Sequence, residues 1–275
     1  MISKIGLHIR LTSTLTEVIE KALRLNVPFF QTFFIYPSGK YIKFEKNDVF
    51  EFLRVRNKYF QNLYLHGSYW INLCNPNIPA YKVLKKEILM AKKLEFTHLV
   101  LHPGAATGCK DKTEGIEFLA KALNRICKEE QDIKIILENT AHANSSIGGD
   151  INDFKILMNY LKYPEKILYC IDSAHAYSWG YDLSNFKRQE EFIKLINETI
   201  PKENLALIHL NDTNEKLSSK IDKHCIPGKG NIGKEALIRF LKFDEIKDIP
   251  ILIEPPTIDE NEEKLVLHEL NKWIA

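Results

Sequence analysis

Short apolar runs typical of buried strands alternate eight times with segments of helical periodicity along this chain of 275 residues. The strands are predicted at 4–9, 29–34, 64–68, 98–102, 134–139, 166–172, 205–210 and 250–254. Helices are predicted at 13–25, 46–60, 79–95, 112–130, 151–162, 187–199, 233–242 and 260–273. Near-continuous apolar strands are typical of a parallel sheet that is covered on both faces. Eight such units predict an α/β fold, the (β/α)8 TIM barrel, with outer helices around eight parallel strands.

Ionisable side chains end most of these apolar runs, which read YLHGSY, HLVLHPG, IILENT, LYCIDSAH, LIHLND and ILIEP, and DKH lies in a polar stretch before the last run. Such a side chain must be paired or bind a metal, because burying it alone costs several kcal/mol. Nine residues are therefore candidate metal ligands: His66, His102, Glu138, Asp172, His175, His209, Asp222, His224 and Glu254. A doubly wound open sheet is the alternative fold, but its site draws on two or three strands. Only a closed barrel brings the ends of six strands to one rim.

Imidazole nitrogens and carboxylate oxygens are ligands that zinc prefers in proteins. At three to four protein ligands per ion, nine ligands can hold two or three ions. Asp222 and His224 are two residues apart, so in an extended chain both side chains point to the same side and can bind one ion. Asp172 and His175 are three apart and need not bind the same ion. Asp172 precedes Ser173 and could instead cap a helix.

Composition excludes several other classes of protein. The five cysteines are scattered without a C-x-x-C pair, which argues against a disulfide framework and a thiolate zinc site; Cys225 is expected to be a spectator beside His224. No signal peptide opens the chain, and no apolar run approaches the ~20 residues that span a bilayer, so we expect a soluble, cytoplasmic protein without membrane contact. The absence of a linker favours a single domain over residues 1–275. A net charge of +2 does not indicate nucleic acid.

One stretch late in the chain combines basic and glycine-rich features. It contains Lys216, Lys220, Lys223, Lys229 and Lys234, and residues 228–233 match G-x-G-x-x-G. A dinucleotide site needs this motif directly after a strand, but here a polar stretch precedes it. We expect instead that free amide groups at the start of the next helix bind phosphate. His98, His142 and His268 fit no pattern and are assigned to structure or surface, whereas His8 is expected to orient a ligand.

Taken together, these motifs resemble endonuclease IV, the zinc-dependent apurinic/apyrimidinic (AP) endonuclease family of base-excision repair. The resemblance covers the chain well from about residue 64 to the end, and the first 60 residues loosely. It rests on these segments: His66-Gly-Ser-Tyr69, His102-Pro-Gly104, Glu138-Asn-Thr140, Asp172-Ser-Ala-His175, His209-Leu-Asn-Asp212, Asp222-Lys-His224, Gly228-x-Gly230-x-Ile-Gly233 and Glu254. All nine positions that bind the three zinc ions in that family hold the same residue types here.

The resemblance implies three zinc ions. One would bind to His66, His102 and Glu138; a second to Glu138, Asp172, His209 and Glu254; and a third to His175, Asp222 and His224. It implies hydrolysis of the phosphodiester 5′ to abasic sites in duplex DNA, leaving a 3′-hydroxyl. Glu138 would orient or deprotonate the nucleophile, with Glu254 as the alternative. Tyr69, Trp70, Lys229 and Gly230 would contact DNA, and the protein would be a monomer.

Several positions depart from the family pattern. The loop at 34–41 lacks the family's Arg and Trp, His142 replaces a glycine, Lys223 replaces an arginine, and Arg10, Cys225 and Pro227 are atypical. These changes concern the contacts with DNA more than the metal ligands. Two alternative functions remain: a metal-dependent isomerase or epimerase acting on small sugars, similar to the xylose isomerase group, and a lesion-binding module without turnover. Five histidine ligands argue against the isomerase, which uses mainly carboxylates.

Overall fold

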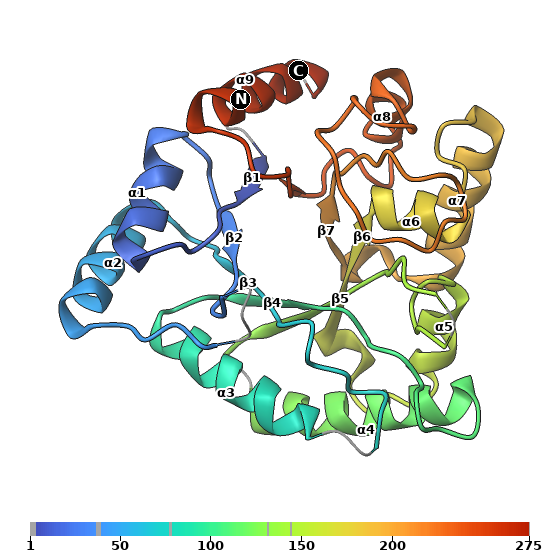
Figure 1. Ribbon diagram of the computed structural model, residues 1–275. Helices are drawn as coiled ribbons and strands as arrows, with labels where there is room; N and C mark the ends of the chain where they lie inside the picture. Colours follow the sequence, from blue (N-terminus) through green and yellow to red (C-terminus); the bar gives the residue numbers. More distant parts are fainter. Residues whose placement is uncertain (1–3, 37–39, 77–78, 131, 144, 275) are drawn as a thin grey trace.

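The computed structural model describes residues 4–36, 40–76, 79–130, 132–143 and 145–274. Eight parallel strands pair in sequence order, and β8 pairs with β1, which closes the barrel (Figure 1). The strands are β1 (Ile5–His8), β2 (Phe30–Thr32), β3 (Tyr64–His66), β4 (His98–Leu101), β5 (Lys134–Glu138), β6 (Ile167–Asp172), β7 (Leu205–His209) and β8 (Ile251–Ile253). The predicted (β/α)8 barrel and all eight predicted strands are confirmed.

The helices form the outer layer around the strands (Figure 1). They are α1 (Leu15–Arg24), α2 (Lys46–Tyr59), α3 (Ala80–Lys93), α4 (Lys112–Glu129), α5 (Asn152–Met158), α6 (Ser173–Trp179), α7 (Phe186–Thr199), α8 (Lys234–Phe240) and α9 (Glu260–Trp273), with 3-10 turns at Pro164–Lys166 and Lys202–Asn204. The prediction missed α6, because six of its seven residues are buried and the segment therefore shows no contrast between an apolar and a polar face. It also extended α5 too far: the chain tightens into turns after Met158, where the amides of Asn159 and Tyr160 donate three residues back.

Side chains alternate between two apolar clusters along each strand. One cluster lines the inside of the barrel and consists of Phe29, Tyr64, Val100, Ile136, Cys170, Leu207 and Leu252. The neighbouring strand residues, such as Leu65, Leu99 and Ile135, belong to a larger cluster between the strands and the helices. This alternation follows from the period of two in a strand, and it decides which residues face the barrel axis.

His98 belongs to the barrel interior, two residues before Val100. It is 6% exposed and stacks on the ring of Tyr64, with ring centroids 4.6 Å apart. Burial and the nearby Lys134 lower the pKa of His98 to about 4. The assignment of His98 to a structural role is confirmed.

We predict that His98 makes the fold sensitive to acid. Its pKa is lower in the folded chain than in the unfolded chain, so the unfolded state takes up a proton first as pH falls below ~6.5. Its contribution, on the order of 3 kcal/mol, is complete above that pH and is lost towards pH 4. Urea unfolding with chelator present at pH 7 and pH 4 tests this in the wild type and in His98→Phe, which keeps the ring stack. An equal loss of stability in both proteins would contradict the prediction.

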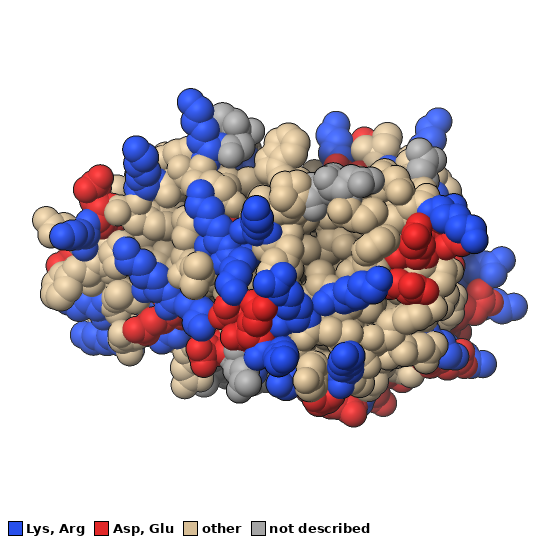
Figure 2. Space-filling model, turned by 90° about the horizontal axis from the view of Figure 1, so that it is seen from below, with Lys and Arg blue, Asp and Glu red and all other residues tan. Residues whose placement is uncertain are grey.

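Ion pairs join α3 to α4 and the turn after it on the outside of the barrel. Lys85 lies 2.7 Å from Glu129, and Lys92 lies 3.0 Å from Glu130 and 2.9 Å from Asp132. Figure 2 shows lysine and arginine side chains interspersed with acidic ones over this face. Such exposed pairs contribute little to stability, and their mixed charge is typical of a solvated surface. Among the described helices, none has the length and apolar character needed to cross a membrane.

Candidate metal centre

The alternation inside the barrel carries the candidate ligands to its axis. Two residues after the inward-facing residue of a strand comes the next inward-facing position, at the carboxyl end. From β3 to β8 these positions are occupied by His66, His102, Glu138, Asp172, His209 and Glu254. His8 and Gln31 occupy the equivalent positions of β1 and β2. A closed barrel therefore assembles six potential ligands from six strands at one rim, as predicted.

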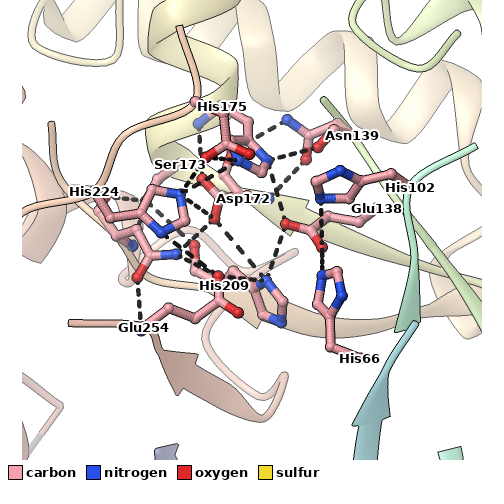
Figure 3. Close-up of polar contacts among 12 residues, drawn as sticks. His66, His102, Glu138, Asn139, Asp172, Ser173, His175, His209, His224 and Glu254 are labelled. Atoms are coloured by element: carbon pink, nitrogen blue, oxygen red, sulfur yellow. Dashed lines mark hydrogen bonds and ion pairs between the residues drawn. The ribbon is translucent and has the colours of Figure 1, made fainter. Parts of the chain in front are cut away.

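Glu138 lies at the centre of this group (Figure 3). Its Oε2 is 3.2 Å from Nε2 of His66 and 3.4 Å from Nε2 of His102. Its Oε1 is 3.0 Å from Nδ1 of His209, which in turn lies 3.4 Å from Oε2 of Glu254. Two separate ligand groups thus share this carboxylate: His66, His102 and Glu138, and Glu138, Asp172, His209 and Glu254. Each oxygen faces a different group, which is the arrangement of a carboxylate that bridges two ions.

A third group forms where α6 and the loop before α8 meet. Nε2 of His175 is 3.0 Å from Oδ1 of Asp222 and 3.3 Å from Nε2 of His224. Nε2 of His224 is in turn 3.5 Å from Oδ1 of Asp222. Asp172 also reaches this group, since its Oδ2 is 3.6 Å from Nε2 of His224. The structure therefore brings the predicted trio together and adds Asp172 as a ligand that can be shared with the second group.

These separations match the requirements of zinc. Two ligand atoms bound to one tetrahedral zinc at 2.0–2.1 Å are ~3.3 Å apart. The distances of 3.0–3.5 Å from Glu138 to His66, His102 and His209, and within the trio around His175, lie near this value. The side chains are therefore spaced as ligands of shared ions.

Hydrogen bonds fix the orientation of several ligands. The Nδ1 atoms of His66 and His175 lie 2.8 and 2.9 Å from the carbonyl oxygens of Gly67 and Asn139, so each ring is held with Nε2 towards the centre. This is the usual arrangement of a metal-bound imidazole. Asp172, besides facing the centre, accepts from the amide of His175 and caps α6. Asp172 therefore caps a helix while it also lies in the potential ligand groups, and its role as a metal ligand stays a prediction.

Two amides that sequence reasoning missed hold Glu254. Asn211 donates to Oδ2 of Asp172 at 2.6 Å and to Oε2 of Glu254 at 3.1 Å, and Gln31 donates to Oε1 of Glu254 at 2.6 Å. Nδ1 of His8 lies 3.0 Å from Gln31 and 3.4 Å from Oε1 of Glu254, so His8 is placed beside a candidate ligand, and its orienting role stays a prediction. A buried polar residue within the apolar run FFQTFF was the available signal for Gln31.

Opposite charges compensate one another inside the centre. Burial alone raises the pKa of Glu138, but the imidazoles of His209 and His102 outweigh it and hold that pKa well below its usual range. Burial lowers the pKa of His175, but Asp172 and Asp222 outweigh it and raise that pKa well above the ordinary value. The pKa values of His175 and His209 are both raised, so without an ion these two rings favour their protonated forms, and a metal has to displace those protons. Acid is therefore expected to weaken metal binding.

The glycine-rich loop is used differently from the prediction. The amides of Gly228, Gly230 and Gly233 donate to Oδ2 of Asp212 at 3.0–3.2 Å, and that of Ile232 donates to Oδ1 at 3.0 Å. The buried carboxylate of Asp212 therefore occupies these loop amides, that of Gly230 included, whereas phosphate binding by the amides at the start of α8 stays a prediction. A Cβ atom at Gly230 would lie 2.5 Å from that carboxylate, which explains the glycine.

Asp212 thereby fixes the loop that carries two of the ligands. Its carbonyl oxygen accepts from the amide of Cys225 at 2.7 Å, directly after His224. Cys225 is buried, and burial raises the pKa of its thiol to about 11. Among the described residues, Cys225 belongs to none of the potential ligand groups, in line with a spectator thiol.

The lysines of this stretch differ in whether their side chains have partners. Lys234 pairs with Glu269 at 2.7 Å, and Lys220 lies 3.3 Å from the centre of the Trp179 ring. Lys216, Lys223 and Lys229 are exposed. In this stretch, Lys216, Lys223 and Lys229 are the lysines without an ion pair or ring contact among the described residues, so their side chains are free to approach DNA.

The exposed ring of Tyr69 lies beside the centre, and the exposed Trp70 follows it in the chain. The ring of Tyr69 is 5.8 Å from that of His102 and 6.2 Å from that of His66, and Tyr69 and Trp70 are 64% and 67% exposed. A pocket of about 190 Å³ opens beside Tyr69 and is lined in part by His102 and His142. His142 was assigned to structure or surface, but the structure places it against the metal centre. No sequence spacing signals this position.

Comparison with known proteins identifies the family. Residues 19–275 match the family described as the xylose isomerase-like TIM barrel. The chain is 31% identical to the probable endonuclease 4 of Thermosipho melanesiensis over 265 residues, covering 94% of this chain and 93% of that protein. It is 29% identical to the probable endonuclease 4 of Nitrosopumilus maritimus, covering 94% and 96%. The crystal structure of endonuclease IV from Thermus thermophilus superimposes with a TM-score of 0.82 at 22% identity, with 99% of both chains covered. The chain therefore belongs to the endonuclease IV family of xylose isomerase-like TIM barrels.

Proposed function

We propose that this protein is a zinc-dependent AP endonuclease of base-excision repair. It cleaves the phosphodiester on the 5′ side of an abasic site in duplex DNA and leaves a 3′-hydroxyl. The observation that carries the proposal is the position of Glu138, whose two oxygens face two ligand groups within one compact centre. The C. elegans relative named apurinic-apyrimidinic endonuclease, 30% identical over 75% of this chain, supports the substrate.

The nine candidate ligands would bind three zinc ions in three groups. His66, His102 and Glu138 would bind one ion; Glu138, Asp172, His209 and Glu254 a second; and His175, Asp222 and His224 a third. Bound zinc ions supply Lewis acidity to a phosphate and lower the pKa of water towards neutrality. The ligands themselves set where the scissile phosphate lies, because their side chains converge from one rim of the barrel.

Two carboxylates are candidates for orienting the attacking water. Glu138 is fully buried and both of its oxygens face imidazoles, so its role is mainly to bind and to fix the centre. The Glu254 side chain is 14% exposed, and Gln31 and Asn211 hold its two oxygens in place. Glu254 is therefore positioned to orient a water molecule that arrives with the substrate.

Selectivity is proposed to come from extrusion of the lesion. An abasic nucleotide has lost its base stacking and pairing, so moving it out of the duplex costs less than moving an intact one. Tyr69, whose ring lies beside the centre, and the adjacent Trp70 present exposed rings that can fill the space left in the duplex. The exposed Lys229 can contact the backbone, whereas the amide of Gly230 is occupied by Asp212.

We predict that Tyr69→Ala and Trp70→Ala each raise the KM for lesion-containing duplex about tenfold. This change corresponds to the loss of one stacking contact between an aromatic ring and a base. The zinc content should not change, because neither ring is a ligand. Steady-state cleavage and elemental analysis of the same preparations check both parts. Tyr59→Ala is the matched control, since Tyr59 is 54% exposed on α2. Loss of zinc in either variant would refute the assigned roles.

The decisive test is incubation with a duplex that carries one tetrahydrofuran abasic analogue, which cannot react by β-elimination. The proposal requires a cut on the 5′ side with a 3′-hydroxyl end. A fully metallated protein that binds the duplex but leaves it intact would reject turnover and favour a lesion-binding module. A protein that holds one manganese or magnesium ion and converts a ketose would instead indicate a sugar isomerase.

A further inference from the structure

His142 lies at the open side of the metal centre, in the loop after β5. Its Nε2 is 3.8 Å from Oδ2 of Asp222, and its ring is 5.8 Å from that of His102. One potential ligand atom from each of His102, His142 and Asp222 lies within 4.8 Å of the other two. The His142 side chain is 49% exposed, whereas the side chains of the ligands around it are mostly buried. This trio is therefore the part of the centre most open to solvent.

Asp222 has one oxygen available for this position. Its Oδ1 lies 3.0 Å from His175 and 3.5 Å from His224, the group proposed to hold the third zinc. Its Oδ2 is the atom nearest His142. Because a carboxylate can bind one ion through each oxygen, binding the third zinc leaves Oδ2 free to face a neighbouring ion.

The backbone around His142 is held in place. The hydroxyl of Ser146 donates to the carbonyl oxygen of His142 at 2.7 Å, and Ser146 itself pairs with Ala105 across an isolated bridge. Among the described residues, Asp222 and His102 are the partners found for the His142 ring. The backbone carbonyl of His142 is thus bonded, and its half-exposed ring lies beside two potential ligands.

We propose that His142 and Oδ2 of Asp222, beside His102, bind a further divalent transition-metal ion such as zinc. This inference rests on the proposed trinuclear cluster, to which it adds a fourth position. Imidazole and carboxylate ligands suit zinc, but the Nε2 lone pair of His102 is used in the group around Glu138, so water must complete the coordination by His142 and Asp222. The fourth ion is therefore held more weakly than the other three, and it places an extra positive charge beside the pocket lined by Tyr69.

The first test counts zinc in the full-length protein at a series of buffered free-zinc concentrations. The wild type should hold three equivalents at low free zinc and a fourth as free zinc rises. His142→Ala should keep the three and lose the fourth, and His268→Ala, an exposed histidine on α9, should retain all four. A wild type that stops at three, or a fourth equivalent of unchanged affinity in His142→Ala, would overturn the inference. Absence of the three tight ions would refute the proposed function. This outcome is distinct from failure of the present inference, which is judged by the difference in zinc content between the wild type and His142→Ala at higher free zinc.

The second test reports direct coordination by residue 142. Cobalt-loaded His142→Cys should show a thiolate-to-cobalt charge-transfer band that is absent from the cobalt-loaded wild type and from His142→Ser. The native cysteines are present in all three proteins, so the difference isolates the new thiol. A fully cobalt-loaded His142→Cys protein without the band would show that this residue does not reach the ion.

Discussion

Replacing Glu138 with glutamine is expected to lower the rate of cleavage at an abasic site by ~10³-fold, the equivalent of several kcal/mol of lost electrostatic stabilisation. The amide is nearly the same shape, but it offers one acceptor oxygen instead of two and carries no charge. It cannot bridge the His66–His102 group and the His209–Glu254 group. The bound zinc should fall below three equivalents, because both groups lose a ligand.

The matched control for this change is Glu263→Gln. Glu263 is also a buried glutamate, but it pairs with Lys21 between α9 and α1, away from the centre. Elemental analysis and single-turnover cleavage of the tetrahydrofuran duplex should separate the two variants. Glu138→Gln protein that keeps three zinc ions and cuts at more than a tenth of the wild-type rate would contradict the bridging role.

Replacing Asp212 with asparagine is expected to destabilise the fold and to remove the third zinc. The carboxylate accepts from five amides: those of Thr213 and Ile232 at Oδ1, and those of three loop glycines at Oδ2. An asparagine amide group would point its own N–H groups at two or three of these donors. Each lost hydrogen bond to a charged acceptor costs about 1.5–3 kcal/mol, so we expect a loss on the order of 4 kcal/mol.

Hydrogen exchange, urea unfolding and zinc content measure this effect. The amides of residues 222–233 should lose protection first, and the zinc count should fall because Asp222 and His224 are no longer held. Asp259→Asn is the control, since Asp259 caps α9 at the surface and its replacement costs about 1 kcal/mol or less. An Asp212→Asn protein with wild-type stability and three zinc ions would show that the loop holds its shape without this carboxylate.

The barrel and its ligands could be predicted because both follow from a short-range pattern. In each of six strands, an inward-facing apolar residue precedes an ionisable one by two positions, as in Tyr64 and His66 or Leu207 and His209. Strand side chains alternate with a period of two. The pattern therefore places each ionisable side chain on the inner face of the barrel and at the carboxyl end of its strand. The closure of the barrel then brings the ligands together without further information.

Other features depend on contacts between distant loops, which no local pattern encodes. The glycine-rich sequence at 228–233 indicates amides that can bind an anion. It does not show that the anion they bind is the carboxylate of Asp212. His142 meets Asp222 across 80 residues of chain because two loops converge over the rim. The polar residue in the run FFQTFF indicates that Gln31 has a buried partner, but the sequence does not show that Gln31 and Asn211 both donate to Glu254.

The most direct test of the metal centre is anomalous diffraction at the zinc absorption edge from crystals grown at low free zinc. Three peaks are predicted: one between His66, His102 and Glu138, one between Glu138, His209 and Glu254, and one between His175, Asp222 and His224. Glu138 should contact the first two ions through different oxygens. A single peak, or side chains turned away from one another in protein soaked with excess zinc, would contradict the trinuclear centre on which the proposed chemistry depends.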